Sequence, residues 1–213
     1  MEEISNKTLA ILLIAAIVIS LGGTLISLNR LARIKVPMIT GFYGAAEEAI
    51  VQLEITALVQ VNFTTDTINW GSGTVAIGTD FCVLNSYDAS IGANCTDFTP
   101  QTAGLVLENI GNRNVTLNIT MEKDASTFIT GSSPVCKWNV SNLEPSSCPG
   151  MALTPGAWQT CATTALIVCN STDGGFLAKD ESDTLKFDVL VQIPSDALPG
   201  AKTNVMTATA AAI

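Results

Sequence analysis

The apolar run near the start of the chain, from Leu9 to Leu28, constrains the fold more than any other feature. About twenty such residues form an α-helix about 30 Å long, enough to cross the hydrocarbon core of a membrane or to fill the axis of a helical filament. Three cations, Arg30, Arg33 and Lys35, follow the run, and from about Glu48 the chain is rich in Thr, Val, Asn, Ser and Gly. The sequence therefore predicts a long hydrophobic helix followed by a β-rich part.

A short break separates these two parts. Pro37 disfavours helical geometry in the residue before it, and Gly41 and Gly44 permit turns. About 165 residues follow, which is enough for one well-packed domain. We therefore expect a helix over 1–36, a hinge over 37–48 and a single domain over 49–213.

Short alternating runs with turn residues between them fill this domain. A long strand with a bulge near Thr56 or Ala57 is predicted over 49–63. The clearest hairpin is predicted over 105–121, as two runs joined through 109–114. Further strands are predicted at 74–77, 128–130, 137–140, 158–168, 184–193 and 203–211. The pattern is typical of a mainly β fold: a single antiparallel β-sandwich, Ig-like or jelly-roll-like, preceded by the long amino-terminal hydrophobic α-helix.

The overall charge and the missing histidine exclude several function classes. The formal net charge of −9 leaves no basic face for a phosphate backbone, so nucleic acid is not expected as a partner. The chain has no histidine, which removes the usual general base and the commonest zinc ligand. We therefore expect a protein that is not an enzyme, with no catalytic residue, no cofactor and no metal site.

The cysteines indicate an oxidising compartment. All six lie beyond the apolar run, and none are spaced as Cys-x-x-Cys, the pattern of many metal and redox sites: Cys82, Cys95, Cys136, Cys148, Cys161 and Cys169. Six cysteines allow 15 connectivities. The shortest spacings favour the pairs Cys82–Cys95, Cys136–Cys148 and Cys161–Cys169, each closing a short loop.

Six asparagines precede x-Ser or x-Thr without an intervening proline, and they agree with export. These candidate N-glycosylation sites are Asn62, Asn94, Asn114, Asn118, Asn139 and Asn170. A chain rich in threonine generates some sequons by chance, so the set carries more weight than any single site. It predicts a glycosylated surface.

Two clusters of residues are candidates for binding. Asp173, Asp180, Glu181 and Asp183 could gather around calcium, but their spacing is not that of an EF-hand, and a solvated acidic loop is favoured. Trp70, Trp138 and Trp158 could form a sugar-stacking face, but packing in the core or in loops is favoured. Between residues 71 and 73, Gly-Ser-Gly reads as a β-turn rather than a phosphate loop or nucleophile elbow.

The apolar run admits three interpretations. A cleaved signal peptide is disfavoured because Glu2 and Glu3 stand where a basic region is needed. A plain membrane anchor would place the cations after the run, and the domain with them, in the cytoplasm, which contradicts the cysteines. In the third interpretation, the helix lies in the membrane before assembly and then packs in the core of a filament, which removes this conflict.

Small residues recur along the run at spacings that allow helices to approach closely: Ala16, Ser20, Gly23, Thr24 and Ser27. The segment from Thr8 to Ser20, continued by Asn-Arg-Leu-Ala-Arg at 29–33, resembles the start of type IV pilins and archaeal pilin-like subunits. This resemblance implies a long apolar helix that ends in an arginine-bearing amphipathic turn.

A second resemblance lies in the domain. Three stretches, at 66–75, 107–117 and 191–200, look like archaeal cell-surface β-sandwich proteins and, more distantly, the TasA/camelysin fibre proteins. The resemblance implies an exported module that polymerises or coats a cell, and it implies no catalytic residue.

The last residues, 203–213, are β-prone and uncharged beyond Lys202. An exposed strand of this kind would be an aggregation hazard. We therefore expect it to pair, within its own sandwich as the favoured case or with a sheet of the next subunit.

Taken together, these observations predict a structural subunit of an extracellular, pilus-like filament. It would be a homo-oligomer that polymerises through its amino-terminal helix, lies in the membrane before assembly, and faces outward with a glycosylated sandwich. The alternative is a membrane-anchored monomer at the cell surface, associated with an S-layer, that mediates adhesion or binds surface glycans.

Overall fold

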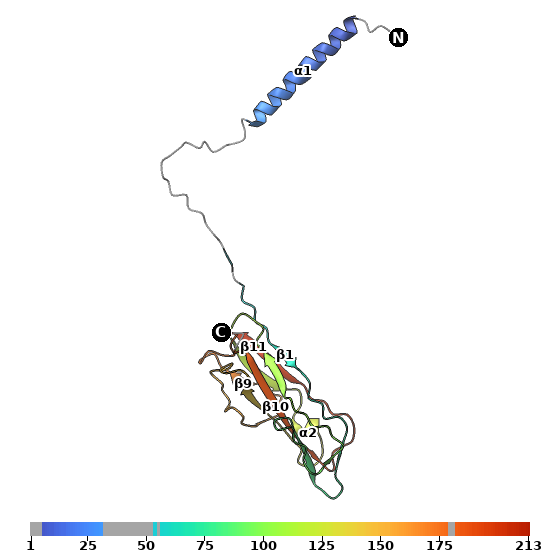
Figure 1. Cartoon of the computed structure of the whole chain (residues 1–213), viewed down its shortest axis with the longest axis vertical. Helices are drawn as coiled ribbons and strands as arrows, with labels where there is room; N and C mark the ends of the chain where they lie inside the picture. The colour runs from blue at the N-terminus through green and yellow to red at the C-terminus, as the bar shows by residue number, and fades with distance from the viewer. Residues whose placement is uncertain (1–5, 32–52, 55, 179–181) are drawn as a thin grey trace. The chain divides into compact units, whose positions relative to one another are not determined.

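The computed structural model describes residues 6–31, 53–54, 56–178 and 182–213 (Figure 1). The chain divides into two compact units, Met1–Leu53 and Glu54–Ile213. The second unit begins a few residues after the predicted domain start at 49. The predicted hinge, 37–48, lies outside the described residues.

The first unit contains the helix α1, Asn6–Leu31, of 26 residues. Lys7 and Thr8 precede its apolar part. In the part of the chain that the structure describes, no helix has the length and apolar character needed to span a membrane. The predicted fold class is corrected accordingly: the protein is mainly β, and a long hydrophobic helix ahead of the sandwich is not shown.

The second unit is a β-sandwich in which every paired strand is antiparallel (Figure 1). The larger sheet has the order β1 (Asn62–Thr65), β5 (Leu105–Glu108), β10 (Thr184–Pro194), β7 (Val135–Asn142) and β8 (Gln159–Thr160), and β3 (Phe81–Asn85) also pairs with β10. The smaller sheet has the order β11 (Met206–Ala212), β6 (Val115–Met121) and β9 (Leu166–Cys169). A third sheet joins only β2 (Thr74–Val75) and β4 (Cys95–Thr96).

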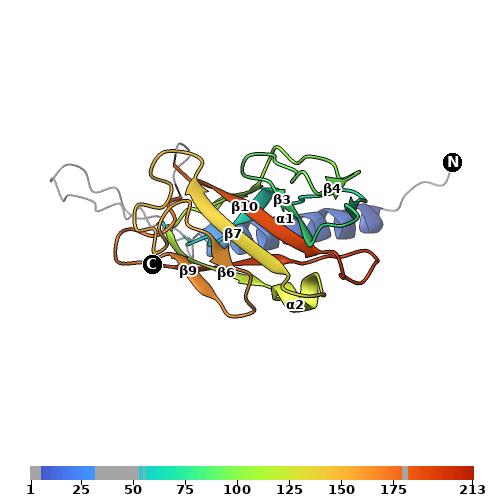
Figure 2. The same ribbon diagram turned by 90° about the horizontal axis from the view of Figure 1, so that it is seen from below.

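The core lies between the two main sheets and follows from the alternation of each strand. Leu105 and Leu107 of β5 are buried, as are alternate residues of β6 from Val115 to Met121. The central strand β10 contributes Phe187, whose ring meets Trp138 of β7 at 6.0 Å between centroids. Figure 2 shows β7 and β10 side by side in one layer. Aromatic and branched side chains on these alternating positions hold the two layers together.

The predicted hairpin over 105–121 is wrong. β5 pairs with β1 and β10 in the larger sheet, whereas β6 pairs with β9 and β11 in the smaller one. Both runs alternate with one apolar face, and the two faces are buried from opposite sides of the same core. The residues between them therefore cross from one sheet to the other instead of closing a turn.

Several other predicted strands are also corrected. Within the described residues of 49–63, the strand begins only at Asn62. Before it, the amide of Leu58 donates to the side chain of Asn112 in a loop, and not to a neighbouring strand. Residues 125–128 form the short helix α2 (Ala125–Phe128), which begins where Asp124 accepts a hydrogen bond from the Thr127 amide. The run 158–168 is split into β8 and β9, which belong to different sheets.

The carboxy-terminal strand is confirmed. β11 pairs with β6 along its whole length, from Met206 opposite Met121 to Ala212 opposite Val115. The favoured expectation, pairing within the chain's own sandwich, is therefore the one that the structure shows.

Candidate functional site

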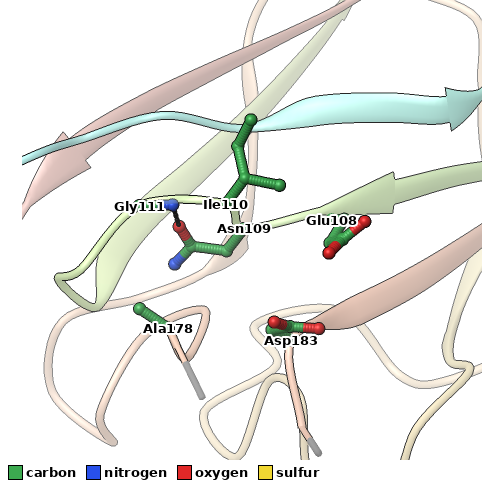
Figure 3. Close-up of a pocket in the computed structure, with 6 residues that line it drawn as sticks. All are labelled: Glu108, Asn109, Ile110, Gly111, Ala178 and Asp183. Atoms are coloured by element: carbon green, nitrogen blue, oxygen red, sulfur yellow. Dashed lines mark hydrogen bonds between the residues drawn. The ribbon is translucent and has the colours of Figure 1, made fainter. Parts of the chain in front are cut away.

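A pocket of about 310 Å³ opens where β5 ends (Figure 3). Its walls are Glu108, Asn109, Ile110, Gly111, Ala178 and Asp183. Glu108 is the last residue of β5, and Asp183 directly precedes β10, whose Thr184 pairs with Glu108. Two carboxylates are thereby brought to one side of the pocket.

The amide of Asn109 fixes the shape of the pocket floor. Its Nδ2 donates to the backbone oxygens of Arg113 and Phe176, each at 3.1 Å, and its Oδ1 accepts from the amide of Gly111 at 3.1 Å. Asn109 is buried, so these bonds replace those that water would supply. The side chain therefore anchors the crossover between the two sheets.

Glu144 lies beside the pocket and is bound to the segment that carries Asp183. Its Oε2 accepts from the amide of Asp183 at 3.1 Å and from the Thr184 hydroxyl at 2.9 Å. These donors, the Asp183 amide first, lower the pKa of Glu144. The carboxylate thus serves a local backbone role and is not held ready to accept a substrate proton.

Of the acidic residues that could gather around calcium, the structure describes Asp173 and Asp183. Asp180 and Glu181 lie outside the described residues, and no group of three His, Cys, Asp or Glu side chains within the described part could hold a metal ion. Asp183 is buried at the pocket, whereas Asp173 is exposed in the turn that follows Asn170. Chemically, the described lining of the pocket offers the carboxylates of Glu108 and Asp183 beside the amide of Asn109.

All six cysteines form disulfides, as predicted, but only one predicted pairing is confirmed. Cys82–Cys95 joins β3 to β4. The other bonds are Cys136–Cys161 and Cys148–Cys169, so the predicted Cys136–Cys148 and Cys161–Cys169 pairs are wrong. The reason is strand pairing: Lys137 of β7 is opposite Thr160 of β8. Cys136 directly precedes Lys137 and Cys161 directly follows Thr160, so the two cysteines lie side by side, with 5.4 Å between their Cα atoms.

The predicted glycosylation sites differ widely in exposure. Asn62 is exposed on the edge strand β1. The side chains of Asn94, Asn114 and Asn170 make hydrogen bonds to the backbone, and Asn118 is half-buried on β6. Asn139 is only 1% exposed, which leaves no room for a glycan in the folded domain.

The tryptophans do not form an exposed face. Trp138 is in the core, and the half-buried Trp70 packs against the core. Trp158 is half-buried in the loop before β8. Where a β-turn was predicted, at 71–73, the chain has a bend at Ser72, with Gly71 at φ 71°.

The small residues predicted to pack helices lie on α1. Ala16, Ser20, Gly23 and Thr24 are exposed, and the side chain of Ser27 lies outside the described part. A Cβ added at Gly23 would meet no atom within 4 Å. In a single chain this face of α1 is exposed, so a helix of a second chain could pack against it.

Sequence reasoning missed a buried polar cluster on the outer side of the larger sheet. Ser86, Asn139 and Asp188 are each at most 1% exposed. The only signal in the sequence was a Lys-x-Asp pair within the apolar run of β10, at 186–188, whose alternation places both side chains on the face opposite Phe187. A charged residue that is fully buried in a strand requires a partner, and this one has Lys186 at 3.0 Å.

Comparison with known protein families, characterised proteins and solved structures finds no match for this chain. Its function is therefore argued from its own residues.

Proposed function

We propose that this protein is a structural subunit of an extracellular filament, assembled through contacts between copies of α1. The observation that carries the proposal is the exposure of seven large apolar side chains on the described part of that helix. They are between 50% and 75% exposed: Ile11, Leu13, Ile14, Ile17, Val18, Ile19 and Leu21. Apolar area on this scale is normally covered by another surface.

The distribution of these side chains favours several neighbours over one. At about 100° per residue, positions 11, 13, 14 and 17 to 19 spread over about two thirds of the circumference of the helix. A helix with large apolar side chains over so wide an arc is stable when other apolar surfaces cover it. Several copies of α1 packed together would provide such surroundings, and each square ångström covered contributes about 25 cal/mol.

The β domain suits the outer part of such an assembly. Three disulfides link its strands and loops, and they indicate an extracellular or otherwise oxidising environment. The exposed sequon at Asn62 would carry a glycan on this surface. Among its described residues, no group of three His, Cys, Asp or Glu side chains could hold a metal ion.

Electron microscopy of the purified full-length chain and of one substitution tests this proposal. Ala16→Asp places a charge among the exposed apolar side chains of α1, and Ala201→Asp places the same charge at an exposed position of the β domain. We expect filaments from the unaltered chain and from Ala201→Asp. Ala16→Asp should give no filaments while retaining three disulfides and the β-rich circular dichroism spectrum.

Two outcomes would contradict the proposal. Filaments formed by a folded domain that lacks residues 1–36 would place the cohesive contacts elsewhere. A chain that stays monomeric at all concentrations would favour the surface adhesion protein instead.

A further inference from the structure

The buried cluster on the outer face of the larger sheet is built around Asp188. Its Oδ1 accepts from the Ser86 hydroxyl at 3.1 Å, and the same hydroxyl oxygen accepts from the amide of Val189 at 2.9 Å. The backbone of Gly104 covers the carboxylate so closely that an added Cβ would lie 2.7 Å from Oδ1. Asp188 is therefore held in place and shielded from water.

Lys186 is the cation of this cluster. Its Nζ lies 3.0 Å from Oδ2 of Asp188 and 5.9 Å from the ring centroid of Tyr87, and its side chain is 23% exposed. No hydrogen bond of acceptable geometry reaches Oδ2, although the ammonium is close. The ammonium and the carboxylate thus form an ion pair at contact distance.

Asn139 is the third member. It lies directly opposite Asp188 in the pairing of β7 with β10, and its Oδ1 is buried with no hydrogen-bond partner in the described structure. The unpartnered Oδ1 of Asn139 and the Lys186–Asp188 ion pair therefore belong to one cluster on neighbouring strands. A buried acceptor without a donor destabilises the fold, so the Oδ1 of Asn139 calls for an explanation.

We propose that Lys186 and Asn139 become joined by an intramolecular isopeptide bond, with Asp188 as the group that carries protons. Lys186 pairs with Ser141, two residues from Asn139 on the same face, so the lysine and the asparagine are diagonal neighbours across the two strands. Diagonal Cβ atoms are about 7–8 Å apart, which a lysine side chain spans. No co-reactant is required.

The chemistry balances within these three residues. Asp188 accepts a proton from the Lys186 ammonium, and the neutral Nζ attacks Cγ of Asn139. The new C–N bond forms, negative charge collects on Oδ1, and Asp188 returns the proton as the bond from Cγ to Nδ2 breaks. Nδ2 leaves as ammonia, which takes up the second proton lost by Nζ, so the products are an amide, an ammonium ion and the original Asp188 carboxylate.

Burial favours this reaction over hydrolysis. Asn139 and Asp188 are nearly inaccessible, so water does not compete with Nζ for the same carbon. The strand pairing holds the reactants together before reaction, which converts a slow bimolecular step into an intramolecular one. The product would be a covalent link between β7 and β10, the two longest strands of the sandwich.

Mass spectrometry of the reduced, denatured full-length chain tests the proposal, after expression in a host without N-glycosylation. We expect an intact mass lower than that of the sequence by one ammonia. Trypsin should then fail to cleave after Lys186 and should release 138–179 joined to 180–202 as one branched peptide. The proposed bond lies within the β domain, so the result of this test does not depend on filament assembly.

Three variants separate the roles. Lys186→Arg keeps the positive charge beside Asp188 but removes the primary amine, Asn139→Ala removes the carbon that is attacked, and Asp188→Asn removes the proton carrier. Each of these three variants should show the full sequence mass. Lys137→Arg, on the same strand as Asn139, should keep the loss of ammonia. Disulfide mapping and circular dichroism of Lys186→Arg establish that its fold is intact.

A folded, fully disulfide-bonded chain with the full sequence mass and normal cleavage after Lys186 would overturn the proposal. A loss of ammonia that peptide mapping assigns to an asparagine other than Asn139 would overturn it as well.

Discussion

Cys148 and Cys169 are bonded between the loop that follows β7 and the last residue of β9, and this bond ties the larger sheet to the smaller one. Cys136–Cys161, in contrast, joins residues at adjoining strands β7 and β8 of one sheet. Both bonds are buried in the same core. The Cys148–Cys169 bond therefore constrains the distance between the two sheets, and the Cys136–Cys161 bond constrains one edge of the larger sheet.

Removing the bond between the layers should weaken the domain without unfolding it. Cys148→Ala with Cys169→Ala opens a loop of sequence separation 21 and is expected to lower the free energy of unfolding by about 2–4 kcal/mol. Urea denaturation measures the change. Counting free thiols checks the pairing. Cys148→Ala with Cys169→Ala should contain no free thiol, whereas Cys136→Ala with Cys148→Ala should leave Cys161 and Cys169 unbonded. The opposite result would contradict the connectivity.

The disulfides illustrate what the sequence could predict. Their number, and the pair Cys82–Cys95, followed from composition and short spacing, because β3 and β4 are neighbours both in sequence and in space. The other two pairs depend on which strands lie next to each other, and the run at 158–168 gives no sign that it serves two sheets. Loop length alone therefore favoured the wrong partners.

The same limit applies to the predicted hairpin and to the buried polar cluster. Alternation correctly predicted two strands within 105–121, whose Leu107 and Leu117 are in the core. A period of two, however, is identical for strands of one sheet and strands of opposite sheets. Asn139 and Asp188 are far apart in sequence and become neighbours only through the β7–β10 pairing. A pattern within one strand contains no information about its partner.

Asn109 should be the most sensitive asparagine of the domain. Asn109→Ala removes three hydrogen bonds and leaves the backbone oxygens of Arg113 and Phe176 without their side-chain donor. We expect the free energy of unfolding to fall by about 2–4 kcal/mol, measured by urea denaturation. Asn118→Ala on the half-exposed face of β6 is the matched control and should change it by less than about 0.5 kcal/mol. Equal effects of the two substitutions would show that the Asn109 amide does not anchor the crossover.

Stability should decline in acid partly through Asp196. The hydroxyl of Ser132 donates to its Oδ2 at 2.6 Å and the Ser132 amide donates to its Oδ1 at 2.8 Å, which lowers the pKa of Asp196 below the ordinary 3.8. A carboxyl whose pKa is lower when folded stabilises the folded state above its unfolded pKa, and this contribution is lost as the pH falls through the folded pKa.

Asp196→Asn removes this titration. Its melting temperature should therefore fall less steeply than that of the unaltered chain as the pH is lowered from about 5 to about 2.5. Asp124, Asp88 and Glu144, whose pKa values are also lowered, titrate in both proteins. Parallel curves for the two proteins would show that the Ser132 contacts contribute nothing to folding.

Exposure should decide which sequons are glycosylated. Thr64→Ala removes the sequon of the exposed Asn62, and Ser141→Ala removes that of Asn139, which is 1% exposed, without changing either asparagine. In a host that performs N-glycosylation, we expect Thr64→Ala to lower the intact mass by one glycan and Ser141→Ala to leave the glycan mass unchanged. A glycan on Asn139 would occupy the space in which its side chain faces Asp188, so its detection on folded protein would contradict both the burial of Asn139 and the isopeptide bond proposed for it.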